Sequence, residues 1–300
     1  MLLRDLQRDK DAQIAAVVDI IARAQPDILV VQGIDWDLSN FALSAFASRI
    51  KAAGLALPHQ FSAKPNRGIP SGFDLNDNGR LGDPQDAIGY GQFTGQNGIA
   101  VLARAPIAHD EILDFTQMLW SDLPRALLPY PGQPTRLSDV MPLSSTNHWL
   151  VPIDTGNQGR VWIGGFGATT PVFDGPEDRN GRRNHDETLF WTHLLDGTLP
   201  NTAPKGLILT GNANLDPKRG DGRQDAIRSL LAHPNMQDPK PNHNGDTATV
   251  DFGEDSAGKL RVGYVLPDQN WDIVASGIEW SEDSGDASRH RLVWVDVDRR

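Results

Sequence analysis

The chain has 300 residues, of which 39% are hydrophobic and 22% charged, with a formal net charge of −11 and no cysteine. This composition is typical of a folded globular protein, and the lack of cysteine excludes disulfides, thiol catalysis and cysteine-based zinc sites. The negative charge weighs against broad nucleic-acid binding, which needs a positive surface.

No apolar run reaches the roughly 18 residues of a membrane span. The opening MLLRDLQRDKDAQ is charged too early for a signal peptide, so we expect a soluble protein as given. If an upstream leader is removed, a periplasmic or secreted location is favoured over the cytoplasm.

Apolar spacing predicts a helix over residues 11–24, and the β-branched run at 27–33 predicts a buried strand. A second helix is predicted over 39–54, with Ser39 as its N-cap, followed by a long ordered loop from 58 to 90. Further strands are predicted at 98–104, 147–154, 160–167, 206–212, 260–267, 271–280 and 291–298, and helices at 185–197 and 222–234. Strands mostly follow one another directly, which favours facing sheets with outer helices.

Six segments, taken in order, resemble the endonuclease/exonuclease/phosphatase superfamily, and most closely a bacterial branch with a long loop before its GQxGxAVL strand. The segments are PDILVVQGIDWD, GYGQFTGQNGIAVLARAPI, FDGPEDRNGRRNHDE, LILTGNANLDP, LRVGYVLPDQNWDIVASGIEW and SRHRLVWVDVD. The resemblance implies an α/β fold: a DNase-I-like, four-layer α/β/β/α sandwich of two facing mixed sheets with outer helices. It also implies one domain over residues 1–300, with the site where strand ends converge.

The resemblance implies phosphoester hydrolysis assisted by a divalent metal, but most of the family's catalytic residues are substituted. The mid-chain histidine expected near residues 166–167 is missing. The polar residues at family positions are Asn212, Asn214 and His290, and the substituted positions are Gly33, Gly263 and Arg289. Asn212 stands where the family has the aspartate that activates water, and an amide cannot take that proton.

Two functions therefore remain open. In the first, the chain has lost hydrolysis and is a non-catalytic binding or assembly module. We then expect an anion held by Arg289 and the Asn212 amide, with Arg289 lowering the pKa of His290. In the second, it is an active phosphodiesterase, nuclease or phosphatase that binds Mg²⁺ or Mn²⁺ through Asp35, Asp37 and Asn214.

The family's first strand, which ends in a metal-site asparagine, is absent from these 300 residues. Its loss would leave unpaired backbone inside a sheet. We expect another segment, a second copy of the chain or a partner protein to fill the gap, or the sheet to be rebuilt around it.

Residues 74–86 resemble the first half of a calcium-binding loop. Oxygen-bearing side chains recur at alternate positions before a glycine, and Asp86 follows Gln85, which replaces the usual closing glutamate. The candidate Ca²⁺ ligands are Asp74, Asn76, Asn78 and Asp86. The alternative is a polar turn whose side chains bond their own backbone.

Residues 176–187 concentrate arginines in an otherwise acidic chain. Arg182 and Arg183 are candidate anion-binding residues, because guanidinium groups bind oxyanions through paired donors. The alternative is a loop whose own acids, including Asp186 and Glu187, pair with these arginines. His148, beside a tryptophan on a strand, is expected to be a packed core residue rather than a ligand.

Overall fold

The computed structural model describes residues 2–129, 137, 140–156, 159–279 and 287–300. The helices in this part of the chain are α1 (Leu2–Arg8), α2 (Ala12–Ala24), α3 (Phe41–Ala52), α4 (Arg179–Leu195) and α5 (Asp225–Leu231). The strands are β1 (Ile28–Ile34), β2 (His59–Phe61), β3 (Gly98–Ala103), β4 (Leu113–Asp114), β5 (His148–Asp154), β6 (Arg160–Gly167), β7 (Leu207–Asn212), β8 (Val250–Asp251), β9 (Lys259–Leu260), β10 (Gly263–Pro267), β11 (Trp271–Glu279) and β12 (Leu292–Arg299). Within these residues, no helix is long and apolar enough to cross a membrane.

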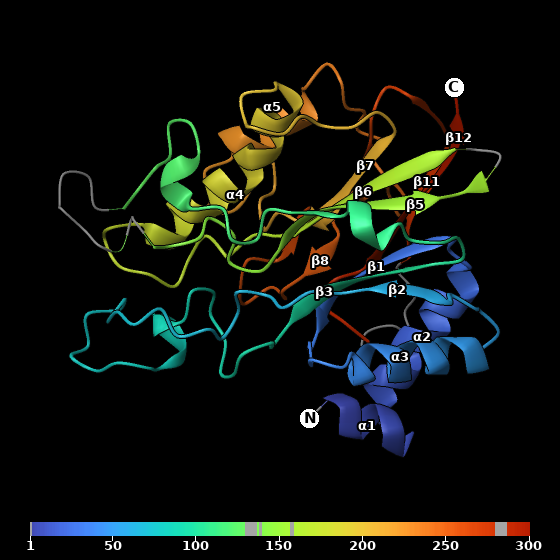
Figure 1. Ribbon diagram of the computed structural model, residues 1–300, viewed down its shortest axis with the longest axis horizontal. Coiled ribbons are helices and arrows are strands. Elements are labelled where there is room, and N and C mark those ends of the chain that lie inside the picture. Colours follow the sequence, from blue (N-terminus) through green and yellow to red (C-terminus); the bar gives the residue numbers. More distant parts are fainter. Residues whose placement is uncertain (1, 130–136, 138–139, 157–158, 280–286) are drawn as a thin grey trace.

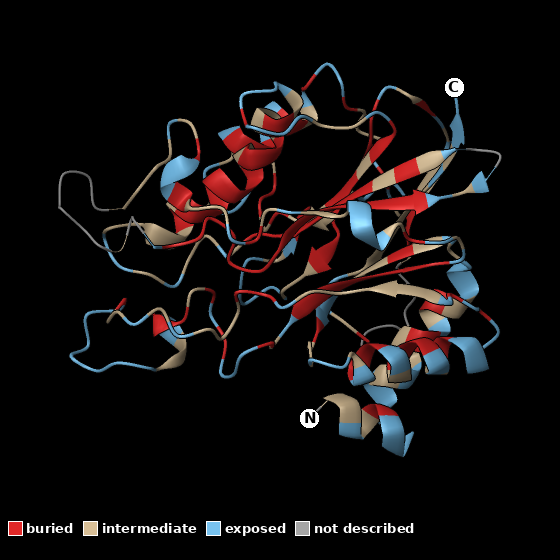
Figure 2. Ribbon diagram, in the orientation of Figure 1, coloured by how far each residue is buried: buried red, intermediate tan, exposed pale blue. Residues whose placement is uncertain are grey.

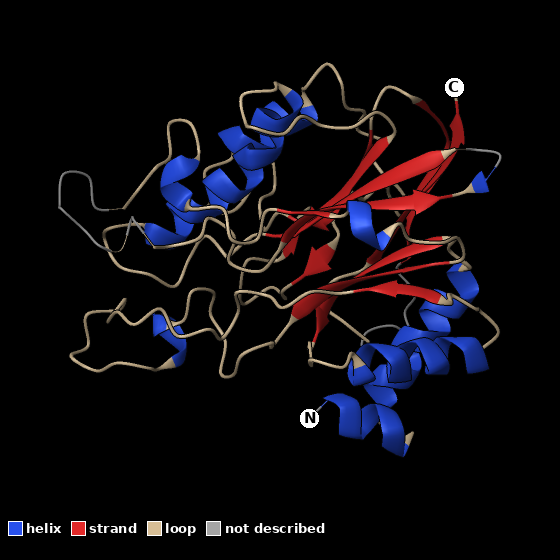
Figure 3. Cartoon of the chain, viewed as in Figure 1, coloured by secondary structure: helices blue, strands red, loops and turns tan. Residues whose placement is uncertain are grey.

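Two sheets face each other, and helices cover their outer sides (Figures 1 and 3). The first sheet has the strand order β1-β3-β2, and the second has the order β10-β7-β6-β5-β4. The β6–β7 pair is parallel and its neighbours are antiparallel, so the second sheet is mixed. The predicted α/β sandwich is confirmed.

Alternation along the central strands builds the layers. On β3, Ile99 and Val101 face the core between the sheets, while Ala100 and Leu102 face the helices α1–α3. On β5, Trp149 faces the same central core and Leu150 faces the side of α4 and α5. Both strands are buried on two faces, and Figure 2 shows the buried residues concentrated in the middle layers.

The outer edge of β1 carries no partner strand within the described residues, because β1 pairs only with β3. The β11–β12 ribbon nevertheless packs on the same two cores as β1. Leu292 packs with the cluster that holds Leu29, and Val297 packs with the cluster that holds Ile28. β12 therefore packs on the same cores as β1, and no hydrogen bond joins the two strands within the described residues. The absence of the family's first strand stays a prediction. What fills the place between β1 and β12 stays a prediction.

Several element boundaries differ from the prediction. α4 begins at Arg179 and not at residue 185, and the predicted strand over 260–267 is divided into β9 and β10. The N-cap predicted at Ser39 is wrong, because Asn40 occupies that position without a side-chain bond. Asp37 caps α3 instead: its carboxylate accepts from the backbone N–H groups of Ser39, Phe41 and Ala42.

We predict that Asp37→Ala lowers the free energy of unfolding by about 1–2 kcal/mol, because it removes the acceptor for the first N–H groups of α3. Urea unfolding monitored by circular dichroism measures this loss. The control is Asp27→Ala, which breaks an exposed ion pair with Arg104 at 3.0 Å and should cost less than about 1 kcal/mol. Equal losses in the two variants would contradict the capping role.

Candidate functional site at the strand ends

The ends of β1, β6, β7 and β10 meet at one edge of the sandwich. Gln32 of β1 donates through Nε2 to the Phe166 carbonyl at 3.1 Å, which joins the two sheets. Asn212 pairs in register with Gly167 on one side and with Gly263 on the other. This group and its neighbours form what we call the strand-end site: Gln32, Gly33, Gly167, Asn212, Asn214, Gly263, Arg289 and His290.

Thr249 connects Arg289 and His290 to the rest of the strand-end site. Its hydroxyl accepts from the Gly263 backbone N–H at 2.9 Å, and its carbonyl accepts from the Arg291 N–H at 2.8 Å. His290 forms an isolated β-bridge with Val250, the residue that follows Thr249. The structure therefore brings the predicted family positions to one edge.

The two asparagines of the strand-end site bond to their own surroundings. Asn212 Oδ1 accepts from the Asn214 backbone N–H at 3.0 Å, and Asn214 Nδ2 donates to the Ala168 carbonyl at 2.8 Å. Asn214 adopts a left-handed backbone conformation with φ of 50°. This leaves the Asn212 amide N–H groups and Asn214 Oδ1 as the side-chain atoms still open to a ligand within the described residues.

Desolvation lowers the pKa of the His290 imidazole, although the residue keeps an exposed surface. The predicted direction is correct, but the predicted cause is wrong: burial, and not the charge of Arg289, produces the shift. The edge of the imidazole packs against Phe252, with ring centroids 5.9 Å apart.

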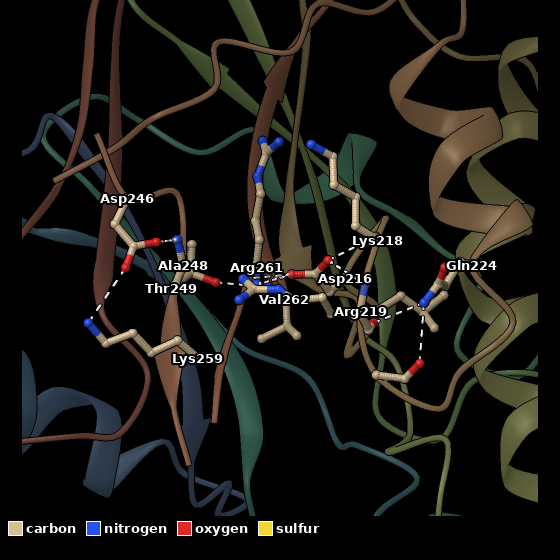
Figure 4. Close-up of polar contacts among 12 residues, drawn as sticks. Asp216, Lys218, Arg219, Gln224, Asp246, Ala248, Thr249, Lys259, Arg261 and Val262 are labelled. Carbon is tan, nitrogen blue, oxygen red and sulfur yellow. Dashed lines mark hydrogen bonds and ion pairs between the residues drawn. The ribbon is translucent and has the colours of Figure 1, made fainter. Parts of the chain in front are cut away.

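Asp216 holds the loop that follows Asn214, and sequence reasoning missed this role. Its buried carboxylate accepts from the backbone N–H groups of Lys218 and Arg219 at 2.8 and 2.9 Å, and from that of Arg261 at 2.7 Å (Figure 4). The Asp-Pro pair at 216–217 is a turn signal that could have pointed to it.

Comparison with known proteins matches residues 5–290 to the model of the Endonuclease/Exonuclease/phosphatase family. The chain belongs to this family. A search of curated proteins found no match.

Solved structures of the family share this fold at low sequence identity. An endonuclease/exonuclease/phosphatase from Beutenbergia cavernae is 16% identical with a TM-score of 0.61, over 96% of this chain and 66% of that protein. A family protein from Leptotrichia buccalis is 15% identical with a TM-score of 0.53, over 95% and 92% of the two chains. Sphingomyelinase C from Streptomyces griseocarneus is 17% identical with a TM-score of 0.50, over 96% and 92%.

The two aspartates predicted as metal ligands in this family member differ in their availability. Both oxygens of Asp37 accept N–H groups of α3, and metal binding by Asp37 stays a prediction. Asp35 is partly exposed and accepts one bond, from the Asn97 N–H at 3.2 Å. Among the residues that the structure describes, no group of three or more His, Asp or Glu side chains is arranged to hold a metal ion.

The anion site predicted at Arg183 is wrong. The buried guanidinium donates to the carbonyls of Leu143, Pro142 and Ser144 at 2.8, 2.8 and 3.0 Å, and also to that of Ile88. Burial lowers its pKa to about 10, so it still carries its charge at neutral pH. Arg182 uses one N–H on the Glu177 carbonyl at 3.1 Å, and anion binding by its remaining donors stays a prediction.

The alternative prediction, an ion-paired segment, holds in part, because the acids of α4 bond mainly to loops and only Asp186 pairs within the segment among the acids of α4. Asp186 accepts from the Trp120 indole and the Leu127 backbone N–H, both at 2.6 Å. Glu187 accepts from the Ser145 and Thr169 backbone N–H groups at 2.5 and 2.6 Å. Burial raises the pKa of Glu187, and the nearby positive charge of Arg183 opposes that shift. Asp186 Oδ1 also pairs with Nδ1 of His185 at 2.7 Å, so these acids tie down loops and make one pair within α4.

The loop at 74–86 has the geometry of a polar turn whose side chains bond its own backbone, which was the alternative to calcium binding. Asp74 accepts from the backbone N–H groups of Asn78 and Gly79 at 3.1 and 2.7 Å. The buried Asp86 accepts from those of Leu75 and Gly82 at 2.8 and 2.9 Å. Asn76 and Asn78 donate their amides to Asp83. Calcium binding in this loop stays a prediction.

His148 is a packed core residue, as expected. Its Nε2 donates to the Glu187 carbonyl and its Nδ1 accepts from the Ser144 hydroxyl, both at 2.9 Å. This pattern fixes the neutral tautomer, since a carbonyl can only accept. Burial lowers the pKa of His148 to about 4.

We predict that Glu187→Gln lowers the free energy of unfolding by roughly 1–3 kcal/mol, because an amide offers one oxygen and turns its NH₂ toward the second backbone donor. Urea unfolding measures the loss. The control is Glu254→Gln at an exposed position, which should change stability by less than about 0.5 kcal/mol. A neutral result for Glu187→Gln would mean that its carboxylate does not hold the loops.

His148 gives a pH prediction. Its folded-state pKa of about 4 lies below the ordinary 6.5, so the unfolded chain binds the proton more readily. The contribution of the neutral imidazole to the free energy of unfolding is complete above pH 6.5. It falls by roughly 3 kcal/mol as the pH drops toward 4. Urea unfolding at a series of pH values should show this slope in the wild type and lose it in His148→Gln. A slope that is unchanged in the variant would contradict the assignment.

Proposed function

We propose that this family member binds an anion at the strand-end site and does not hydrolyse phosphoesters with a divalent metal. The observation that carries the proposal is the set of groups facing that edge. Asn212 accepts the Asn214 N–H through Oδ1 and makes no hydrogen bond through its amide N–H groups within the described residues, and the exposed Arg289 belongs to the same group of strand ends. Donors and a positive charge attract an anion.

The backbone at Gly33 supports the loss of hydrolysis. The family's acidic metal ligand would stand here, but Gly33 has φ of +84°, where residues with side chains are strained. The register between β1 and β3 shifts at the same point. The glycine at position 33 therefore has a backbone conformation that disfavours any residue with a carboxylate side chain. Metals such as Mg²⁺ depend on charged oxygen ligands of this kind.

The anion can be inorganic phosphate or sulfate, or the phosphate or carboxylate of a larger ligand. As a non-catalytic member, the protein would then act as a binding or assembly module, and the open edge of β1 is a second place where a partner protein or a second copy would dock. That role does not require turnover.

One observation favours the alternative, an active metal-dependent phosphodiesterase. Asp35 accepts a single hydrogen bond, and Asn214 Oδ1 is free of hydrogen bonds within the described residues. Both oxygens are suitable ligands for Mg²⁺ or Mn²⁺. The relative named sphingomyelinase C makes a phosphodiester the first substrate class to test.

The deciding experiment measures hydrolysis of bis-p-nitrophenyl phosphate with Mg²⁺ or Mn²⁺, together with thermal unfolding in Mn²⁺ or in sulfate. We expect no metal-dependent turnover. We also expect a rise in Tm with sulfate that corresponds to about 2.7 kcal/mol at one hundred times Kd and is lost in Arg289→Gln. Metal-dependent turnover that disappears in Asp35→Ala would establish the alternative.

A further inference from the structure

A cavity of about 630 Å³ lies between the long loop before β3 and the first turns of α4. Its apolar wall includes Leu75, Ile88, Trp120, Met141 and Val172, with Phe173 at the rim. Phe173 is 90% exposed, which is unusual for a phenylalanine side chain. A cavity of this size and lining is typical of sites for small molecules, which range from about 300 to 1,000 Å³.

Arg67 is a lining residue whose guanidinium finds no hydrogen-bond partner within the described residues. It lines the cavity, and its Nε is buried without a hydrogen-bond partner. The guanidinium forms no ion pair with any residue that the structure describes. A buried donor without a partner costs about 1–3 kcal/mol, so an acceptor inside the cavity would remove that cost.

The backbone that carries Arg67 is held firmly. The buried Asn66 donates through Nδ2 to the carbonyls of Thr116 and Ser144, both at 2.8 Å. A side chain at Gly68 would meet the Phe93 carbonyl at 1.9 Å, so only glycine allows this close approach of the two loop segments. The Arg67 carbonyl also accepts from the Gly95 N–H at 3.2 Å. The guanidinium is therefore presented to the cavity from a fixed backbone, which favours binding.

The charges around the cavity are positive. Arg179 also lines it and uses one N–H on the Leu75 carbonyl at 2.8 Å, which leaves its other donors available. Arg183 lines it as well, with its donors on backbone carbonyls. No Asp or Glu is among the described lining residues. Glu187 attracts Arg67 electrostatically, but both of its oxygens accept backbone N–H groups.

We infer that this cavity binds a small oxyanion with an apolar body, whose carboxylate or phosphate lies against Arg67 while the apolar part packs on Ile88, Trp120 and Met141. A planar guanidinium with its donors free matches the two oxygens of such a group. The apolar wall accounts for the rest of the ligand. The inference holds whether or not the strand-end site hydrolyses phosphoesters, because no residue of the strand-end site lines this cavity.

The test is isothermal titration calorimetry of the whole chain with hexanoate, hexyl phosphate and neutral hexan-1-ol. We expect saturable binding of at least one of the two anions, and the stronger one identifies the oxyanion. Hexan-1-ol should bind about tenfold or more weakly, because it lacks the charge that pairs with Arg67. Equal affinity for hexan-1-ol, or no binding of either anion, would overturn the inference.

Three variants locate the binding. Arg67→Met should weaken anion binding about tenfold or more, because it removes the guanidinium and keeps only an unbranched apolar side chain. Thr170→Trp places bulk at an exposed lining position and should also weaken it, without altering the buried loop. Arg80→Gln is the matched control, because it removes an exposed arginine of the same loop that does not line the cavity. Unchanged affinity in both Arg67→Met and Thr170→Trp would place the binding elsewhere. Turnover of bis-p-nitrophenyl phosphate reports separately on the strand-end site.

Discussion

The buried polar residues in the first turns of α4 organise the loops at the end of the second sheet where β6 and β7 finish. Arg183 bonds the carbonyls of the segment before β5, and Glu187 bonds the N–H groups of Ser145 and Thr169. Asn184 donates to the Thr169 and Ala213 carbonyls at 2.6 and 2.8 Å. One helix therefore fixes three loops at the same end of the second sheet: the loop before β5 and those after β6 and β7. Buried polar groups of this kind are costly unless each is satisfied, so the loops and the helix depend on each other.

This arrangement gives the strongly charged segment at the start of α4 a role in the fold that does not depend on catalysis. The arginine and the acids in α4 bind backbone groups, so they are needed for the fold whatever happens at the strand ends. Gly33, Asn212 and Gly263 take no part in these α4 contacts. The proposed loss of carboxylates at the strand-end site would therefore leave these α4 contacts in place.

The strands and their layers could be predicted from the sequence, because β-branched runs such as residues 27–33 and 98–104 carry a strong local signal. The family positions could also be placed, because the fold brings the ends of β1, β6, β7 and β10 together. The role of Arg183 could not be predicted, since it depends on carbonyls that lie about 40 to 95 residues away along the chain. Arg67 gave no signal either, because an arginine next to a glycine in a polar loop is typical of an exposed turn.

The same reasoning explains the error at Ser39 and the capping role of Asp37. Ser39 has the composition of an N-cap, but Asn40 in a left-handed conformation shifts the helix start, and the Asp37 carboxylate reaches the free N–H groups. From the sequence alone, an aspartate near a strand end has the pattern of a metal ligand even where its oxygens accept helix N–H groups. Local composition identifies the residues that can cap or coordinate, and the backbone path decides which of them does so.

The most direct test of the account is a crystal structure of the protein soaked with sulfate and, separately, with Mn²⁺. The account predicts sulfate held by the Asn212 amide and Arg289, and no Mn²⁺ at the strand ends. Mn²⁺ bound to both Asp35 and Asn214 at coordination distance would contradict it and assign a working metal site to this chain.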